Sequence, residues 1–391
     1  MKYLWSDKEA KKCKDELELR VYTSRLLGCD NSLVLHGGGN TSVKIDDTLY
    51  VKGSGWDLSS IEKEGFSPVS LNALLDMAKK EQLSDTKMVK LQKEAMSDKR
   101  APNPSVEAIL HAIIPYKFVD HTHANSIVTI SNSINGKKII NELYKDYLIV
   151  DYVMPGFILA KKIYELTSKG FKWEECKGII LHHHGIFTFG DSAKKSYSNM
   201  IKSVQTAEDY LKNFKLNIPE QKRTKEYNIK KLKELIDRAK GYETVFKINQ
   251  SNLALFYSNQ PNLKEFSSRG VLTPEHIIRT KRVPLVIEDD DFKGAIEKYI
   301  EDYKAYFKRY AKGQTMLNPA PNYIVLKGYG VISTSKTQKE ANIINDIINA
   351  TLEAVLKADK LGGYLSINEK ESFEMEYWEL EQNKLKRQKA K

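Results

Sequence analysis

Two short histidine-rich segments constrain the fold of this 391-residue chain most tightly. The first is Lys117-Phe-Val-Asp-His-Thr-His, and the second is Gly178-Ile-Ile-Leu-His-His-His-Gly. They hold five of the eight histidines: His121, His123, His182, His183 and His184. Apolar residues flank both clusters, so both segments are predicted to be buried strands, the second bending at Gly185. Hydrogen bonding in a core explains one buried histidine well, but two such clusters favour a shared metal ion.

The alternation of side chains along a strand predicts how these imidazoles are shared. Residues i and i+2 point to the same face, so His121 and His123 can bind one ion. A third imidazole from the second strand completes the three-protein-ligand pattern of a catalytic zinc. By the same geometry His182 and His184 share a face, and spacing alone leaves either as the third ligand. Gly185 favours His184, because a residue without a side chain lets a metal or substrate approach closely.

The composition is that of a globular protein, and the length predicts two domains. The length exceeds that of one ordinary core, and 41% hydrophobic with 10% aromatic residues provides the apolar side chains that folding requires. No apolar run reaches the roughly 20 residues that span a bilayer, and the first residues lack an apolar signal core. Three scattered cysteines argue against a disulfide framework. We expect a cytoplasmic protein with no membrane partner.

The net charge of +11 has two interpretations. A basic chain can bind nucleic acid, or it can carry a lysine-rich surface that favours anionic substrates. Basic residues alternate with acidic ones except in the tail from Lys384 to Lys391, and no RNP, KH, zinc-finger or helix-turn-helix pattern is present. We therefore expect no nucleic acid partner, and a phosphate-bearing small molecule instead.

The chain divides into two predicted domains, 1–220 and 221–391, at a charged, proline-containing segment over 215–225. Periodicity before this boundary predicts a hairpin over 41–52, a helix that begins near Ser105, and helices over 7–27, 70–96 and 192–213.

The second domain carries a weak echo of the second histidine segment. Tyr323-Ile-Val-Leu-Lys-Gly-Tyr-Gly-Val-Ile-Ser precedes a predicted helix over 337–358, as Gly178-Ile-Ile-Leu-His-His-His-Gly-Ile-Phe-Thr precedes a helix. On this alignment Tyr329 stands where the first domain has His184. The second domain would then be a copy without the metal ligands, although any strand–glycine–strand–helix unit shows the same pattern.

A carboxylate that moves protons beside a metal has one candidate, Glu107 in Pro104-Ser-Val-Glu-Ala. Its place near a helix start suits the helix dipole equally well, so the residues alone leave both roles open. Two glycine-containing loops, Gly37-Gly-Gly-Asn-Thr-Ser and Gly53-Ser-Gly, offer backbone N–H groups and hydroxyls to a phosphate. Neither matches the Walker A or dinucleotide pattern, and a tight hairpin would use the same glycines.

Taken in order, these segments resemble the class II aldolase/adducin family over roughly residues 20–215. The motifs are Gly-Gly-Gly-Asn-Thr-Ser, Lys-Gly-Ser-Gly, Pro-Ser-x-Glu, His-x-His and His-His-Gly, and the ordered set is more specific than any one of them. The segments from Thr273 to Leu285 and from Tyr377 to Leu385 resemble the aldolase portion of rhamnulose-phosphate aldolase/short-chain dehydrogenase fusions, with the dehydrogenase part absent. The resemblance implies a three-layer α/β/α fold with a mainly antiparallel central sheet, and a second α/β domain.

The resemblance also assigns roles to single residues. The positions that match the family's zinc ligands are His121, His123 and His184, and Glu107 matches its acid/base carboxylate. The positions that line the sugar phosphate in relatives are matched by Asn40, Ser54, Gly55 and Ser105. Val106 stands where close relatives can carry a second serine, a departure that implies a rearranged phosphate pocket or another substrate. The candidates for a tyrosine proton donor are Tyr144, Tyr147 and Tyr152.

These matches imply a lyase that depends on a divalent metal, with zinc as the preferred ion. The ion would chelate a ketose phosphate and favour an enediolate while Glu107 moves the proton, so that retro-aldol cleavage releases dihydroxyacetone phosphate and a short aldehyde. The same enediolate would serve a dehydratase, an epimerase or a decarboxylase. Adducin-like relatives without the metal site are non-catalytic interaction proteins. The family also implies a homo-oligomer, and we expect four subunits.

Overall fold

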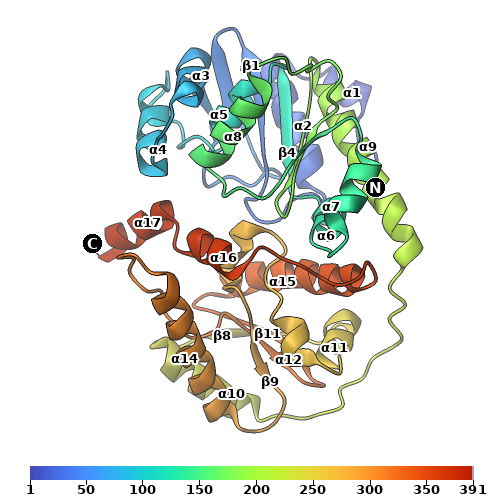
Figure 1. Ribbon diagram of the computed structural model, residues 1–391, viewed down its shortest axis with the longest axis vertical. Coiled ribbons are helices and arrows are strands. Elements are labelled where there is room, and N and C mark those ends of the chain that lie inside the picture. The colour runs from blue at the N-terminus through green and yellow to red at the C-terminus, as the bar shows by residue number, and fades with distance from the viewer. Residues whose placement is uncertain (390–391) are drawn as a thin grey trace. The chain divides into compact units, whose positions relative to one another are not determined.

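The computed structural model describes residues 1–389, which fall into two compact units. Unit 1 comprises Met1–Ser131 and Lys137–Asn213, and unit 2 comprises Asn132–Gly136 and the chain from Phe214 onward. Each unit has its own sheet with helices on both faces (Figure 1). The end of the predicted basic tail, residues 390–391, lies outside the described residues. None of the helices over residues 1–389 has the length and hydropathy of a membrane span.

Unit 1 is built on one seven-stranded sheet with the order β3-β2-β1-β4-β7-β6-β5. The strands are β1 Asn40–Ile45, β2 Thr48–Lys52, β3 Phe66–Ser70, β4 Phe118–Thr122, β5 Leu148–Val150, β6 Ile179–Leu181 and β7 Gly185–Gly190. All neighbouring strands are antiparallel except β5 and β6, which are parallel. The prediction of a mainly antiparallel sheet is therefore confirmed.

Helices cover both faces of this sheet and complete the three predicted layers. They are α1 Asp7–Ala10, α2 Glu16–Gly28, α3 Leu71–Lys79, α4 Asp85–Glu94, α5 Ala108–Ile113, α6 Asn125–Ser131, α7 Gly136–Leu143, α8 Phe157–Thr167 and α9 Ala193–Leu211. Helices α3, α5 and α8 lie on one face, and α2 and α9 lie on the other (Figure 1). On the first face Leu49 and Val51 of β2 pack against Met77 and Ile109 in a buried apolar core.

Two of the predicted helices are each divided in the structure. The helix expected over 70–96 is α3 and α4, because Lys80 is extended and Ser84 starts a new helix by accepting a hydrogen bond from the Lys87 N–H. The helix expected over 7–27 is α1 and α2, and Asp15 caps the second of these. Serine and aspartate satisfy the first N–H groups of a helix, so they favour a fresh start at these positions.

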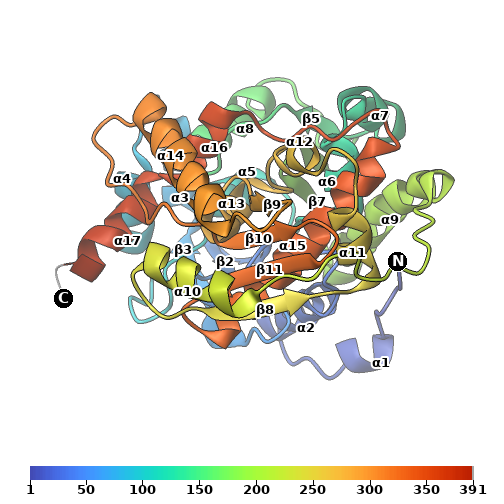
Figure 2. The same ribbon diagram turned by 90° about the horizontal axis from the view of Figure 1, so that it is seen from below.

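Unit 2 contains a four-stranded sheet with the order β8-β11-β10-β9. The strands are β8 Val245–Asn249, β9 Leu285–Ile287, β10 Tyr323–Leu326 and β11 Gly330–Ser335. The helices are α10 Ile229–Lys240, α11 Asn252–Ser258, α12 Leu263–Ser267, α13 Ile277–Thr280, α14 Phe292–Tyr310, α15 Gln338–Asp359, α16 Glu369–Glu376 and α17 Glu379–Lys389. Helices α10 and α14 pack on one face of the sheet, and α11 and α15 pack on the other (Figure 2).

The sheet of unit 2 repeats the topology of one end of the sheet of unit 1. Strands β4 to β7 have the order β4-β7-β6-β5, and strands β8 to β11 have the order β8-β11-β10-β9. Directions agree at every step, because β5–β6 and β9–β10 are parallel and the other pairs are antiparallel. A long helix, α9 or α15, follows the last strand of each set. This shared topology supports the predicted internal repeat.

Candidate metal centre

Three histidines of unit 1 converge at one end of strands β4 and β7. His121 lies on β4, His123 follows that strand, and His184 directly precedes β7. One ring nitrogen of each lies within 4.8 Å of the others, and the Nε2 atoms of His121 and His123 are 3.0 Å apart. Among the described residues, His182 and His183 are not part of this group. Three imidazole nitrogens at this spacing suit a zinc ion that keeps a position for substrate.

The third histidine comes from a turn rather than from a strand. Strand β6 ends at Leu181 and β7 begins at Gly185, so His182, His183 and His184 form the connection. His183 has a left-handed conformation with a φ of 60°, which a residue other than glycine seldom adopts. The prediction that His182 and His184 share a face by strand alternation is therefore wrong, because the chain reverses between them.

Neighbouring groups fix the ring of His121. Its Nδ1 lies 3.0 Å from the carbonyl oxygen of Ile186, which can only accept, so Nδ1 carries the proton and donates it. Nε2 then holds the lone pair that a metal requires. The ring of Phe187 stacks on His121 with a centroid distance of 4.0 Å and an interplanar angle of 14°. Both contacts orient the imidazole before any ligand binds.

A buried ion pair anchors β4 next to the histidines. Asp120 Oδ1 lies 2.6 Å from Arg20 Nη2 on α2, and both side chains are fully buried. The hydroxyl of Ser196 on α9 donates to the other oxygen of Asp120. These contacts attach the strand to both helices on that face, so the backbone that carries His121 has little freedom to shift.

Gly185 allows the turn to approach the histidines. A Cβ at this position would stand 2.4 Å from the carbonyl oxygen of Thr122 and 3.1 Å from one ring carbon each of His121 and His123. The corresponding glycine of unit 2, Gly330, would place its Cβ 2.4 Å from the carbonyl oxygen of Asn249. Any larger residue at either glycine would push the turn away from the neighbouring strand.

Glu107 lies beside the three histidines. It holds the N-cap position of α5, but its side chain makes no capping hydrogen bond. Its Oε2 is 3.5 Å from His121 Nε2 and its Oε1 is 3.8 Å from His184 Nε2, and the residue is 5% exposed. Within residues 1–389, Oε1 has no hydrogen-bond partner. A buried carboxylate oxygen in this state is costly unless a cation or a substrate proton reaches it, so the donor set fits a divalent metal.

A chain of hydrogen bonds behind Glu107 orients its carboxylate. The hydroxyl of Ser42 lies 2.8 Å from His111 Nδ1, His111 Nε2 contacts Asn40 Oδ1, and Asn40 Nδ2 donates to Glu107 Oε2 over 2.7 Å. Burial holds the pKa of His111 well below its usual value, so the ring is neutral and has one donor and one acceptor. Ser42 therefore donates to the ring, and the ring donates to the amide. This arrangement turns the NH₂ group of Asn40 towards the carboxylate.

The four residues that were predicted to line the sugar phosphate lie in two separate places. Asn40 and Ser105 contact Glu107, and the hydroxyl of Ser105 accepts the Glu107 backbone N–H over 3.2 Å. Ser54 and Gly55 lie in the exposed loop after β2, where the backbone N–H of Ser54 donates to the Asn103 carbonyl over 2.8 Å. Asn40 therefore contacts the candidate catalytic carboxylate itself, and Ser105 contacts the backbone of the same residue.

Lys52, at the end of β2, is a residue of the site that sequence analysis missed. Its ammonium donates to the carbonyl oxygen of Gly37 over 3.1 Å, in the first glycine-containing loop. Burial lowers the pKa of Lys52 to about 8, against the opposing effect of the charges of Asp57 and Glu107. The available signal was a lysine that ends an apolar strand directly before Gly53.

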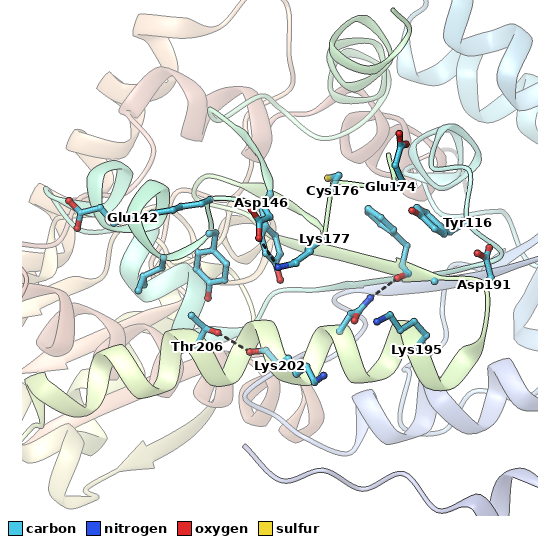
Figure 3. Close-up of a pocket in the computed structure, with 17 residues that line it drawn as sticks. Tyr116, Glu142, Asp146, Glu174, Cys176, Lys177, Asp191, Lys195, Lys202 and Thr206 are labelled. Carbon is cyan, nitrogen blue, oxygen red and sulfur yellow. Dashed lines mark hydrogen bonds and ion pairs between the residues drawn. The ribbon is translucent and has the colours of Figure 1, made fainter. Parts of the chain in front are cut away.

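A cavity of about 750 Å³ in unit 1 is separate from the histidines (Figure 3). Neither the three histidines nor Glu107 line it, but Tyr144 and Tyr147 do. The hydroxyl of Tyr144 donates to the Ser203 carbonyl over 2.8 Å, and that of Tyr147 lies 2.7 Å from Ser203 Oγ. These two tyrosines are thus held by α9, whereas the hydroxyl of Tyr152 is buried elsewhere.

Comparison with known families agrees with this arrangement. The family described as Class II Aldolase and Adducin N-terminal domain matches residues 18–211, and the one described as Aldolase class II, second domain matches residues 223–385. The chain therefore belongs to the class II aldolase/adducin family, and it carries the second domain as well as the first.

Individual relatives cover this chain to different extents. The chain is similar to the uncharacterized oxidoreductase YuxG of Bacillus subtilis (strain 168), with 30% identity over 98% of this chain and 60% of that protein. The chain thus spans about 60% of the length of this curated relative. The N-terminal class II aldolase domain of a conserved protein from Thermoplasma acidophilum is 37% identical, with a TM-score of 0.49, over 54% of this chain and 99% of that one. L-Fuculose-1-phosphate aldolase from Thermus thermophilus is 16% identical, with a TM-score of 0.34, over 50% of this chain and 95% of that one.

Proposed function

We propose that this chain is a class II aldolase-type lyase that uses a divalent ion, preferably zinc, to cleave a ketose phosphate. The observation that carries this proposal is the convergence of His121, His123 and His184 beside the buried carboxylate of Glu107. Family membership supports the same class of enzyme and a small-molecule substrate. Solved relatives include proteins named L-fuculose-1-phosphate aldolase.

The residues around the centre divide the work of such a reaction. His121, His123 and His184 would hold the ion, which when bound polarises a substrate carbonyl and stabilises negative charge on its oxygen. Glu107 would transfer the proton to and from the reacting carbon. Because Asn40 engages Oε2, Oε1 is the oxygen available for this transfer. Cleavage of the carbon–carbon bond would leave dihydroxyacetone phosphate and a short aldehyde.

The phosphate of the substrate would bind near the loops that begin at Gly53 and at Pro104. Their backbones pair with each other, since the Ser105 N–H donates to the Lys52 carbonyl over 3.0 Å. Ser54, Gly55 and Ser105 offer hydroxyl and N–H groups, and Lys52 supplies a positive charge. We assign Asn40 to the orientation of Glu107 as well as to this pocket.

A substrate screen tests the proposed function. Purified protein is treated with a chelator and then assayed with a panel of ketose 1-phosphates, with and without zinc, for release of dihydroxyacetone phosphate. We expect release from at least one substrate, loss with chelator and recovery with zinc. Product analysis by mass spectrometry identifies dehydration, epimerisation or decarboxylation, any of which would contradict the cleavage. If the purified protein holds no divalent ion before it is treated with chelator, the proposal of a metal-dependent enzyme is contradicted. Light scattering on the same protein tests the proposed homotetramer.

A further inference from the structure

Two sequence segments that the proposed function does not use lie together in unit 2. The segment from Thr273 to Leu285 contributes Lys281 and Arg282, and the segment that begins at Tyr377 directly follows Glu376 at the end of α16. Lys281 and Tyr377 both contact Tyr303 of α14. The two segments are thus close in space although they are far apart in the sequence.

The core of this region is a buried cluster of ionisable side chains. Lys281 and Glu376 are 5% and 0% exposed, and Lys281 Nζ is 3.9 Å from Glu376 Oε1. The hydroxyl of Tyr303 donates to Glu376 over 2.7 Å and lies 2.6 Å from the hydroxyl of Tyr377. Lys281 Nζ also lies 3.6 Å from the centre of the Tyr303 ring. The lysine is thus held by one long ion pair and one aromatic face.

This cluster is poorly suited to stabilising the fold. A buried ion pair repays the loss of hydration only when its geometry is good, and among residues 1–389 Lys281 Nζ has no hydrogen-bond partner. Lys281 also has a φ of 64°, in the left-handed region that disfavours side chains. Strained backbone and buried charge both cluster at functional sites, so Lys281 marks this region as a candidate site.

A pocket of about 270 Å³ opens beside this cluster. One wall is the face of α14 that presents Tyr299, Tyr303 and Tyr306, which are spaced by four and three residues. The lining also includes Arg282 and the following residues up to Val286. The volume is slightly below the roughly 300–1,000 Å³ of pockets for drug-sized ligands, so it suits a smaller metabolite.

The charges that line this pocket are not balanced. Its two acidic residues are already paired, Asp302 with Lys298 and Glu369 with Arg309. Lys264 and Arg282 remain as positive charges of the lining, and the Nε of Arg282 is buried without a hydrogen-bond partner among the described residues. Arg282 and the buried Glu376 interact through their charges, but the Nε–H of this guanidinium has no acceptor among the described residues, so it can donate to a further oxyanion.

We propose that the pocket of unit 2 binds a small organic anion, whose carboxylate or phosphate pairs with Arg282 and whose carbon body packs against the tyrosines of α14. Lys264 adds positive charge at the same opening. All of these residues belong to unit 2, so the proposal does not depend on the metal centre of unit 1.

Calorimetric titration of the full-length chain, after treatment with chelator, tests this proposal. The probes are glycerol 3-phosphate, glycerate and, as a neutral control, glycerol. We expect saturable binding of at least one anion and none of glycerol, and Arg282→Gln should weaken that binding at least about tenfold. The matched control is Arg238→Gln, at an exposed arginine of α10, which should leave binding unchanged.

The outcomes distinguish the source of the anion. A response to glycerol 3-phosphate alone identifies a phosphate ester, and a response to glycerate alone identifies a carboxylate. Binding that Arg282→Gln leaves unchanged, or no binding of either anion, overturns the proposal. If Arg282→Gln lowers the melting temperature, Lys264→Gln provides the same comparison with a smaller expected loss.

Discussion

The turn between β6 and β7 and the turn between β10 and β11 share their strand pairing and their hydrogen bonds, although Gly330 has a φ of 126° and Gly185 does not have a positive φ. Leu181 pairs with Gly185 in the first, and Leu326 pairs with Gly330 in the second. The N–H of the residue before each glycine donates to the carbonyl of that leucine, over 3.1 Å in the first turn and 3.0 Å in the second. Each turn has a left-handed residue two positions before the glycine, with φ of 60° at His183 and 70° at Gly328.

The side chains of the two turns differ at each position that could hold a metal. Tyr329 occupies the position of His184. Phe187 pairs with His121 and Ile332 pairs with Ile248, and each follows its glycine by two residues, so Ile248 corresponds to His121. Gln250 then corresponds to His123. The difference teaches that this backbone forms without a metal, and that three side chains determine whether a turn of this kind can bind one.

The largest expected effect comes from giving the first turn the residue of the second. His184→Tyr removes one of three imidazoles, so we expect bound zinc to fall below about one tenth and turnover to fall at least about 1,000-fold. Loss of a residue that only orients a metal ligand lowers metal affinity or activity about 10- to 100-fold, so loss of a ligand itself should have a larger effect. Metal analysis and the dihydroxyacetone phosphate assay measure both. A variant that keeps its zinc would show that Tyr329 is not what distinguishes the two turns.

Glu107→Gln comes next in expected size. The helix before β8, α10, has Asn228 at the N-cap position that Glu107 holds in α5, so a change to an amide also makes unit 1 more similar to unit 2. Glutamine cannot transfer the proton, and we expect turnover to fall at least about 100-fold while zinc remains bound. Turnover and metal content are measured on one preparation. Near-normal turnover would reject the catalytic role of Glu107.

His111→Leu tests the hydrogen bonds behind the carboxylate. Leucine fills the space but cannot hold the amide of Asn40, so the amide can rotate and present its oxygen to Glu107. We expect kcat to fall about 10- to 100-fold, with bound zinc unchanged. His111→Gln, which keeps a donor, should recover part of the rate. If both variants lose the same activity, His111 supports the fold rather than the orientation of Glu107.

The smallest effect is expected for His183→Gly, which copies Gly328. Relief of the left-handed conformation offsets the greater flexibility of glycine in the unfolded chain, so the free energy of unfolding should change by less than about 1 kcal/mol. Zinc content and turnover should stay within about twofold. Denaturant titration and metal analysis check both values. Loss of zinc would mean that His183 itself takes part in binding.

Sequence alone predicted the parts of this molecule that depend on local pattern. The pair His121 and His123 follows from alternation along one strand, and the hairpin over 41–52 follows from two alternating segments around Asp46-Asp47. The turn at His183 could not be predicted, because histidine seldom adopts a positive φ and only the completed sheet requires it there.

The surroundings of Glu107 were beyond local pattern for a different reason. Asn40 and His111 are 71 residues apart, and Asn40 and Glu107 are 67 residues apart, so only the folded sheet brings them together. The resemblance to a family identified Glu107 itself but gave no role to His111 or Lys52. Contacts over such separations depend on strand order, which one sequence does not specify.

Gly185 and Gly330 affect how the sequences of new relatives should be interpreted. At both glycines an added Cβ would stand 2.4 Å from a carbonyl oxygen of the chain beside the turn, whether or not histidines are nearby. Their retention in a newly sequenced relative therefore reports only that the hairpin is intact. The residue immediately before the glycine is more informative, because it is histidine in the turn with the imidazole group and tyrosine in the turn without it. A search for metal-dependent members should weight that preceding position and treat the glycine as common to both kinds of domain.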